Sequence, residues 1–434
     1  MRRPEPAEVR AARAWLSRAV EPGDARLHRL LCEVGPVEAR RLLQHGEGPP
    51  AAARQAAARR AEDHASADLA TAARLGIRLA TPEDDEWPAA ALHAMEISVA
   101  RGSADLAPPQ ALWVCGSLRV DEAVGRAVAI VGARDATAYG VRVAADLAYA
   151  LARRGWTVVS GGAYGIDGAA HRGALAADGT TVAVVAGGLR SPYPAGHTKL
   201  FERIAAAGLL LSEWPPDCAP QRHRFLIRNR VIAALAAGTV VVEAGARSGA
   251  ASTARRAREL GRALMAVPGP VTSAQSVGCH RLLQDADARL VTCADDVLEM
   301  VGSLSEDLAP RPPGETRPRD RLDPLAQRVL DGFPARGTAS VDRIAVESGV
   351  PVVDVLRCLP SLEIGGFAEQ SEAGWRLGRA ARRDGERSPP AMPRESARSV
   401  TDPAGSESAG MGSRRSKDGP VKPNAVGQGG RRPD

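Results

Sequence analysis

The chain has 434 residues, of which 44% are hydrophobic and 25% charged, values typical of globular proteins. They exclude a wholly disordered chain, a collagen-like fibre and a small disulfide-stapled scaffold. No apolar run reaches the ~18 residues that span a membrane, and the charged N-terminus lacks the apolar core of a secretion signal, so we expect a cytoplasmic protein. The six scattered cysteines form no CxxC pair, which is typical of reduced thiols.

The net charge of +6 is concentrated at the C-terminal end of the chain. From residue 379 onward there are 12 Lys/Arg and 7 Asp/Glu, a difference of +5, which leaves +1 for the rest. A basic protein often binds nucleic acid, but here that hypothesis has to rest on local clusters of basic residues. Aromatic residues make up only 3% of the chain, too few for a broad base-stacking platform.

Residues 1–75 are predicted to form a helical domain. Apolar residues recur at helical spacing on both sides of Gly35-Pro36, a pair that breaks the run. A helix, a short turn and a second helix are similar to a helix-hairpin-helix or a sterile-alpha-motif domain. Two interpretations are open for this region: contact with the DNA backbone through the turn, or packing against a partner or another part of the protein.

Residues 76–302 are predicted to form a Rossmann-like α/β domain with a mostly parallel sheet. Short runs rich in Val and Ile alternate with amphipathic stretches of helix length, as in a parallel sheet with helices on both faces. The expected strands are 127–131, 157–160, 181–186, 209–212, 239–243 and 263–267. The expected helices are 139–153, 165–175, 197–206, 228–236 and 251–260.

A linker, a small domain and a tail are expected after the Rossmann-like domain. Residues 303–322 are rich in proline and charge, which is typical of a linker. Residues 323–378 show three helical patterns followed by an extended pair, which together predict a winged helix. Residues 379–434 are rich in Gly, Ser, Pro and Arg without periodicity and are predicted to be disordered.

Glycine or a small polar residue follows nearly every expected strand of the sheet. The segments are GAR from residue 132, SGGAYGID from 160, AGG from 186, SE from 212 and EAG from 243. In open parallel sheets ligands bind at the carboxyl ends of the strands, and glycine lets backbone N–H groups approach an anion. The pattern favours an anionic ligand, although glycine also serves loop geometry alone. Neither GxGxxG nor GxxxxGK[ST] is present, so NAD or ATP is not indicated.

The densest basic cluster is QRHRFLIRNR, residues 221–230, which is expected to open a helix. Arg224 and Arg228 lie one turn apart on that helix. Cations at a helix N-terminus are repelled by the positive end of the helix dipole, and a bound anion would offset this repulsion. The alternative is ion pairing with acidic residues such as Glu213 and Glu243.

Further candidate contacts follow the first and third strands. Arg134 adds a cation after the first strand and Lys199 one after the third, while Phe201 either stacks on a base or packs in the core. His171 follows Asp167 by one helical turn, a spacing that acid–base chemistry uses, but packing of this Ala-rich helix explains it equally well. No nucleophile motif and no metal-ligand spacing is found, so we expect neither an enzyme nor a metal or cofactor site.

At these residues the chain resembles the DNA-processing protein family DprA/Smf. The matching stretches run in the family's order over residues 127–292: AIVGARDATAYG, GWTVVSGGAYGIDGAAHRGAL, PYPAGHTKLFERI, LLLSEWPPDCAPQRHRFLIRNRVIAALA, VVVEAGARSGAASTARRARELGRALMAVPG and SVGCHRLLQDADARLV. The resemblance implies a Rossmann-like single-stranded-DNA binder without catalytic activity. It further implies a homodimer that protects single strands and helps to load RecA recombinase during natural transformation.

The basic cluster and the resemblance together predict a set of DNA-binding residues. They are Gly132, Arg134, Ser160, Gly161, Gly162, Lys199, Phe201, Arg224, Arg228, Asn229, Arg230, Ser248, Gly249 and Thr253. The chain departs from the family where the usual SGSLITA segment reads SGAASTA over 248–254, and where the loop lysine aligns with either Thr198 or Lys199. A third departure is the loop GGAYGID, where many relatives have a basic or polar residue near Tyr164.

Two rival functions use the same features. A nucleotide phosphoribohydrolase shares the broad fold and would place Glu213 or Glu243 near a ribose, but its PGGxGT motif is absent. A regulator of double-stranded DNA would act through the winged helix, where Arg357 is the only basic residue of the expected recognition helix 352–363. A partner-binding or regulatory role for that domain is therefore preferred.

Overall fold

The structure is a computed structural model that describes residues 4–59, 64–246, 248–284, 288–302 and 318–381. They belong to two compact units, one within residues 1–310 and one within 311–434. Residues 303–317 of the predicted linker and the predicted disordered tail from residue 382 lie outside the described residues. The remainder of the linker includes a short 3-10 helix, Pro318–Arg321.

The first unit is built on a nine-stranded sheet, in spatial order β1-β2-β6-β5-β4-β3-β7-β8-β9 within its described residues. Neighbouring strands from β6 to β9 are parallel, whereas β1 pairs antiparallel with β2, and β2 with β6. The mostly parallel, Rossmann-like α/β sheet is thereby confirmed. The strands are β1 (Ile77–Ala80), β2 (Leu112–Cys115), β3 (Ala127–Val131), β4 (Thr157–Ser160), β5 (Thr181–Val184), β6 (Leu209–Ser212), β7 (Gly238–Val241), β8 (Ala263–Ala266) and β9 (Arg289–Leu290).

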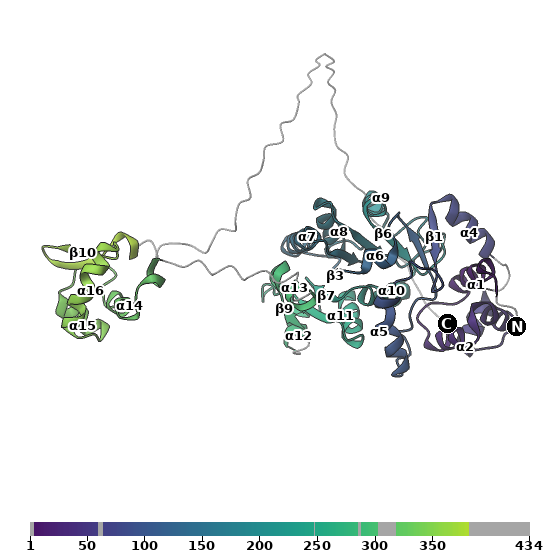
Figure 1. Cartoon of the computed structure of the whole chain (residues 1–434), viewed down its shortest axis with the longest axis horizontal. Coiled ribbons are helices and arrows are strands. Elements are labelled where there is room, and N and C mark those ends of the chain that lie inside the picture. Colours follow the sequence, from purple (N-terminus) through teal and green to yellow (C-terminus); the bar gives the residue numbers. More distant parts are fainter. Residues whose placement is uncertain (1–3, 60–63, 247, 285–287, 303–317, 382–434) are drawn as a thin grey trace, which may run out of the picture. The chain divides into compact units, whose positions relative to one another are not determined.

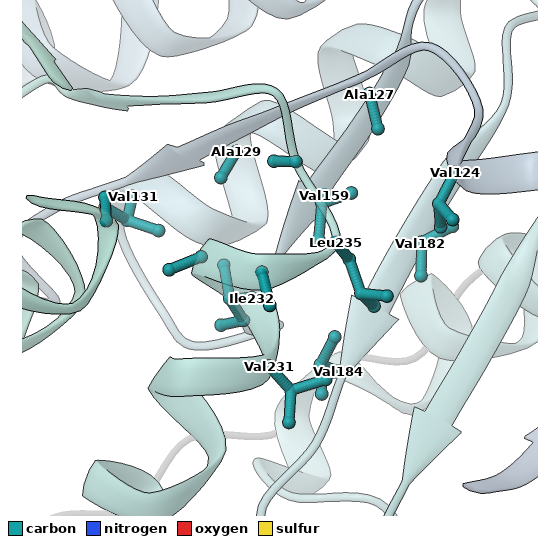
Figure 2. Close-up of a cluster of buried hydrophobic side chains, with 14 of the residues drawn as sticks. Val124, Ala127, Ala129, Val131, Val159, Val182, Val184, Val231, Ile232 and Leu235 are labelled. Carbon is teal, nitrogen blue, oxygen red and sulfur yellow. The ribbon is translucent and has the colours of Figure 1, made fainter. Parts of the chain in front are cut away.

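Helices cover both faces of this sheet (Figure 1). Alternate residues of a strand face opposite sides, so Ile130 of β3 packs with α7, α8 and α13 while Val131 packs with α10 and α11. Figure 2 shows the layer on the α10 side of the sheet, where Ile232 of α10 and Leu235, the residue that follows this helix, lie against strand side chains such as Val159. The helices are α5 (Ala89–Ala100), α6 (Val120–Val124), α7 (Ala138–Ala152), α8 (Ile166–Ala176), α9 (Thr198–Ala207), α10 (Arg222–Ala234), α11 (Gly249–Glu259), α12 (Val277–Gln284) and α13 (Ala294–Val301).

Four N-terminal helices pack onto the same unit. They are α1 (Pro6–Ala19), α2 (Ala25–Gln44), α3 (Pro50–Ala58) and α4 (Ala65–Arg74). The predicted break is present, because Gly35 has a φ of 77° inside α2 and two helical segments meet there. An apolar cluster joins Trp15 of α1 to Trp113 of β2 and Leu210 of β6. The helices thus share a core with the sheet, as the packing interpretation expects, while DNA contact through the turn stays a prediction.

Two differences from the expected elements bear on the site. Helix α10 begins at Arg222 instead of residue 228, after the extended backbone of Gln221. The pattern at 228–236 followed the apolar face from Val231 onward, whereas the basic cluster over 221–230 was itself expected to open a helix and does so. The basic cluster therefore lies within α10. Strands β1 and β2 were not expected, because both precede residue 127, where the alternation of apolar runs and helical stretches begins.

The second unit has three helices and a β-hairpin around its own apolar core. They are α14 (Pro324–Asp331), α15 (Val341–Ser348), α16 (Val352–Ile364), β10 (Ala368–Ser371) and β11 (Gly374–Leu377). Ser340 caps the N-terminus of α15, and Gly349 ends it with a φ of 63°. Val329, Ile344 and Leu359 bring the three helices together. These are the elements expected over 323–378, and the winged-helix assignment itself stays a prediction.

Candidate nucleic-acid interface

A cleft of about 960 Å³ opens at the carboxyl ends of the central strands. It is lined by Gly132 after β3, Ala163 after β4, Gly245 after β7 and one face of α10. Strand β3 lies between β4 and β7. The strands from β4 to β6 follow on one side of β3, and those from β7 to β9 follow on the other side, so the strand order reverses at β3. Ligands of open α/β sheets bind at such a switch point, which makes this cleft the candidate site.

Half of the predicted DNA-binding residues line this cleft. Those in the lining are Gly132, Arg134, Arg228, Asn229, Ser248, Gly249 and Thr253. Those that lie elsewhere are Ser160, Gly161, Gly162, Lys199, Phe201, Arg224 and Arg230. The cleft also contains residues outside the predicted set: Tyr193, which sequence reasoning missed, and Arg222, His223 and Phe225 of the basic cluster. Contact with DNA stays a prediction for every residue of the set.

Arg134 presents an exposed charge at the cleft. Its guanidinium carbon lies 4.7 Å from the ring centroid of Phe225, which holds the cation over the lining of the cleft. Arg222, the first residue of α10, and the neighbouring His223 are exposed on the same lining. The cleft therefore carries cations that a bound anion can reach from solvent.

Arg228 is buried at the base of the cleft and holds the glycine loop after β4. Its Nη1 donates to the carbonyl of Gly161 at 2.7 Å and to the carbonyl of Val184. Burial lowers the pKa of Arg228 to about 10, with Asp167 opposing that shift and Arg134 adding to it. The side chain is therefore charged at neutral pH. Because both Nη1 contacts are carbonyls of the sheet and loop, Arg228 shapes the cleft as well as lining it.

Asp167 fixes the same loop from the N-terminal turn of α8. Its Oδ2 accepts the backbone N–H of Gly161 at 3.1 Å and of Ala163 at 3.4 Å. Burial raises the pKa of this carboxyl, while Arg228 and the two N–H donors act in the opposite direction. The sequence pair Asp167–His171 is not a bonded pair here, since Nδ1 of His171 lies 2.7 Å from Oγ1 of Thr181. Burial lowers the pKa of His171 to about 3, so it is neutral at neutral pH.

Arg224 and Arg230 of the predicted set are engaged in ion pairs. Arg230 binds Glu213 through two contacts of 2.6 and 2.7 Å, and both side chains are buried. Arg224 binds Glu21 at 2.7 Å and lies over the ring of Trp214. This is the ion-pairing alternative that the basic cluster left open. A phosphate contact by either arginine would have to replace a carboxylate partner.

Phe201 packs in the core, as one of its two sequence interpretations expected. The side chain is 2% exposed and joins the cluster that contains Ile204 and Leu210. A base cannot reach the ring in this conformation. Ser160 is also internal, since its hydroxyl donates to the carbonyl of Ile130 at 2.6 Å. Lys199 is exposed on α9, outside the cleft lining.

The N-terminus of α11 forms another wall of the cleft. Ser248 precedes the helix, and its buried Oγ has no hydrogen-bond partner among the described residues. Nδ2 of Asn229 donates to the carbonyl of Gly249 at 3.3 Å, which ties α10 to this turn. Helix N-termini attract anions through free N–H groups and the helix dipole. The α11 turn therefore adds neutral donors to the cationic lining.

The carboxylates that a phosphoribohydrolase would need are occupied. Glu243 accepts the backbone N–H of Thr137 at 2.9 Å and its hydroxyl at 2.6 Å, which places the carboxylate at the N-terminus of α7. Glu213 is paired with Arg230. Within the described residues no group of three His, Cys, Asp or Glu side chains is arranged to hold a metal, and no helix is long and apolar enough to cross a membrane.

The fold and the cleft define a Rossmann-like α/β protein whose switch point suits an anionic ligand. A family model described as DNA recombination-mediator protein A matches residues 78–302. The chain belongs to this family, also called DprA/Smf, whose members are DNA-processing proteins, and the resemblance found in the motifs is confirmed.

A curated relative and one solved structure support the same family. A putative DNA processing protein DprA of Mycobacterium tuberculosis is 52% identical over 374 residues, covering 85% of this chain and 95% of the relative. The crystal structure of DprA from Streptococcus pneumoniae aligns with a TM-score of 0.54 at 29% identity, covering 68% of this chain and 98% of that one. A DNA processing protein A from Helicobacter pylori, solved for its single-stranded DNA binding mode, aligns with a TM-score of 0.41 at 31% identity, covering 44% of this chain and 86% of that one.

Proposed function

We propose that this protein binds single-stranded DNA in the cleft at the ends of β3, β4 and β7 and acts as a recombination mediator without catalysis. The observation that carries the proposal is that an exposed cation, Arg134, and the α11 turn at Ser248 line the same cleft. Cations and free N–H groups are the donors that phosphate oxygens accept. Membership of a recombination-mediator family supports DNA as the source of those phosphates.

The absence of catalysis is supported by the state of the candidate groups. His171 is neutral and buried, and Glu243 is engaged by Thr137. Neither lines the cleft. An acid–base residue must reach the reacting atoms, so the binder is favoured over the hydrolase.

Binding to single strands is tested by the salt dependence of Arg134→Ala. The wild type is expected to bind an oligo-dT more tightly than a duplex of equal length. For single strands the slope of log K against log salt is about −0.7 per neutralised phosphate, so the variant should flatten the slope by roughly that amount. Affinity is measured by fluorescence anisotropy across salt, with nucleotide hydrolysis followed in parallel.

Arg142→Ala is the matched control, because Arg142 is an exposed arginine on α7 outside the cleft lining. It removes the same charge and should leave the slope unchanged. Equal effects of the two substitutions would show that binding follows net charge and not the cleft. Turnover of a nucleoside monophosphate by the wild type would move the protein to the hydrolase class.

The finer roles that the family resemblance implied belong to the same proposal. We propose that the protein acts in the cytoplasm as a homodimer, protects single strands during DNA uptake or recombination, and assists RecA loading. The expected result is a shorter lag of RecA filament formation on single strands and slower nuclease digestion of the bound strand. Both effects should be weaker in Arg134→Ala, because they depend on the cleft.

A further inference from the structure

Phosphate contacts alone do not distinguish a single strand from a duplex, since both present phosphates. Selectivity for single strands usually comes from aromatic side chains on which unpaired bases stack. Phe201, the aromatic residue favoured from the sequence, lies in the core at 2% exposure. The described residues place two other aromatic rings in the cleft lining, Tyr193 and Phe225.

These two rings differ in how much of their surface is free. Phe225 is partly covered, because the guanidinium carbon of Arg134 lies 4.7 Å and that of Arg228 6.0 Å from its centroid. Tyr193 meets Phe225 edge-on, with centroids 5.9 Å apart and an interplanar angle of 76°. The Tyr193 side chain is 49% exposed. The edge contact positions the Tyr193 ring while leaving ring surface open to the cleft.

We propose that Tyr193 is the base-stacking residue of the cleft and that its ligand is an unpaired nucleobase of a single strand. The inference rests on the proposed function, since it names the base contact of the same site. Tyr193 and Arg134 are both held against Phe225, so a base on the tyrosine ring lies within reach of the cation that takes its phosphate. Duplex DNA keeps its bases stacked on one another and cannot offer this contact.

The proposal is tested with two ligands of equal charge, an oligo-dT and an abasic oligonucleotide with the same number of phosphates. Tyr193→Ala should weaken binding of the oligo-dT by roughly 5-fold or more, the lower end of what loss of one base stack costs. Its affinity for the abasic strand should match that of the wild type. The salt slope should be unchanged for both ligands, because no phosphate contact is lost.

Two controls separate stacking from structural damage. Tyr193→Phe keeps the ring and should bind oligo-dT within about 2-fold of the wild type, because stacking needs the π-face and not the hydroxyl. Tyr149→Ala removes another exposed tyrosine, on α7 outside the cleft lining, and should leave binding unchanged. Thermal melting of each variant shows whether the fold is intact.

The outcomes distinguish this inference from the proposed function. Wild-type binding with the expected salt slope, combined with normal oligo-dT affinity of Tyr193→Ala, overturns the stacking role alone. Equal loss of affinity for the dT and abasic strands also overturns it, because the tyrosine would then serve the backbone. Failure of the wild type to bind either strand overturns the proposed function and the inference together.

Discussion

Arginine residues of one short segment have different surroundings in this protein. Arg222 is exposed on the cleft, Arg228 donates to carbonyls at its base, and Arg230 is 1% exposed and paired with Glu213. The same side chain therefore serves the cleft surface, the loop geometry and the core within nine positions of α10. Exposure and partners, and not residue type, separate these roles.

The buried pair gives a prediction about stability. Arg230→Ala should lower the free energy of unfolding by about 3–5 kcal/mol, because it leaves the Glu213 carboxylate buried without its partner. Urea denaturation measures the change. Arg222→Ala is the control, since an exposed arginine should change stability by less than ~0.5 kcal/mol. If Arg230→Ala were as stable as the wild type and flattened the slope of log K against log salt for single-stranded DNA, Arg230 would instead be a phosphate contact.

At the scale of elements, Glu21 joins the N-terminal helices to α10. It lies between α1 and α2 and accepts hydrogen bonds from Arg224 at 2.7 Å, Arg59 at 2.7 Å and Nε1 of Trp214 at 3.0 Å. Burial by itself would raise the pKa of Glu21, but the hydrogen bonds from Arg224 and Trp214 outweigh it and the pKa falls to about 2. The ionised carboxylate is therefore part of the folded state at neutral pH.

This linkage predicts how stability changes with pH. The pKa of Glu21 is lower in the folded than in the unfolded protein, so its contribution is complete above about pH 4.5 and is lost as pH falls toward 2. Glu21→Gln should reduce stability at pH 7 by on the order of 3 kcal/mol, and the difference from wild type should shrink in that acidic window. Chemical denaturation at several pH values measures it.

The exposed Glu38 provides the comparison for Glu21. Glu38 forms an ion pair with Arg41 one turn along α2, at the surface. Solvent screens such exposed pairs, so Glu38→Gln should leave stability nearly unchanged at every pH. A pH-independent loss in Glu21→Gln would mean that packing and not charge links the helices to α10.

At the scale of the whole molecule, the cleft lies entirely within the first unit. Helix α16 of the second unit, the expected recognition helix, offers little for DNA. It exposes Val353 and Leu356, and its basic residue Arg357 lies 3.3 Å from Asp354. A face that combines apolar residues with a paired arginine is better suited to a protein partner than to a phosphate backbone.

A division of the chain tests this arrangement. A fragment of residues 1–310 should bind oligo-dT with nearly the affinity of the full chain, because it holds the whole cleft. A fragment of residues 318–381 should fold around its own core and bind neither single-stranded nor duplex DNA. Titrations of both fragments by anisotropy provide the measurement. Duplex binding by the second fragment would favour the regulator interpretation.

Most of the parallel sheet was predictable because its strands are local apolar runs. Strands β3, β4 and β6 have the bounds that the sequence predicted. A strand that is buried on both faces is a continuous run of apolar residues, so it can be identified from the sequence without knowledge of the strands it pairs with. Strands β1 and β2 were missed because they precede the alternating strands and helices, and their antiparallel pairing joins distant parts of the chain. Membership of the family was also visible in the sequence, because its glycine loops are contiguous motifs.

The cleft itself was predictable in part. The glycine-rich loops and Arg134 could be assigned to the cleft because they directly follow apolar strands, which is visible in the local sequence. The partners of Arg224 and Arg230 are Glu21 and Glu213, far from them in sequence, and adjacent arginines look alike until those contacts form. The core position of Phe201 likewise depends on packing. Local patterns therefore identify the strand-end loops, whereas long-range contacts select which side chains remain free to meet a ligand.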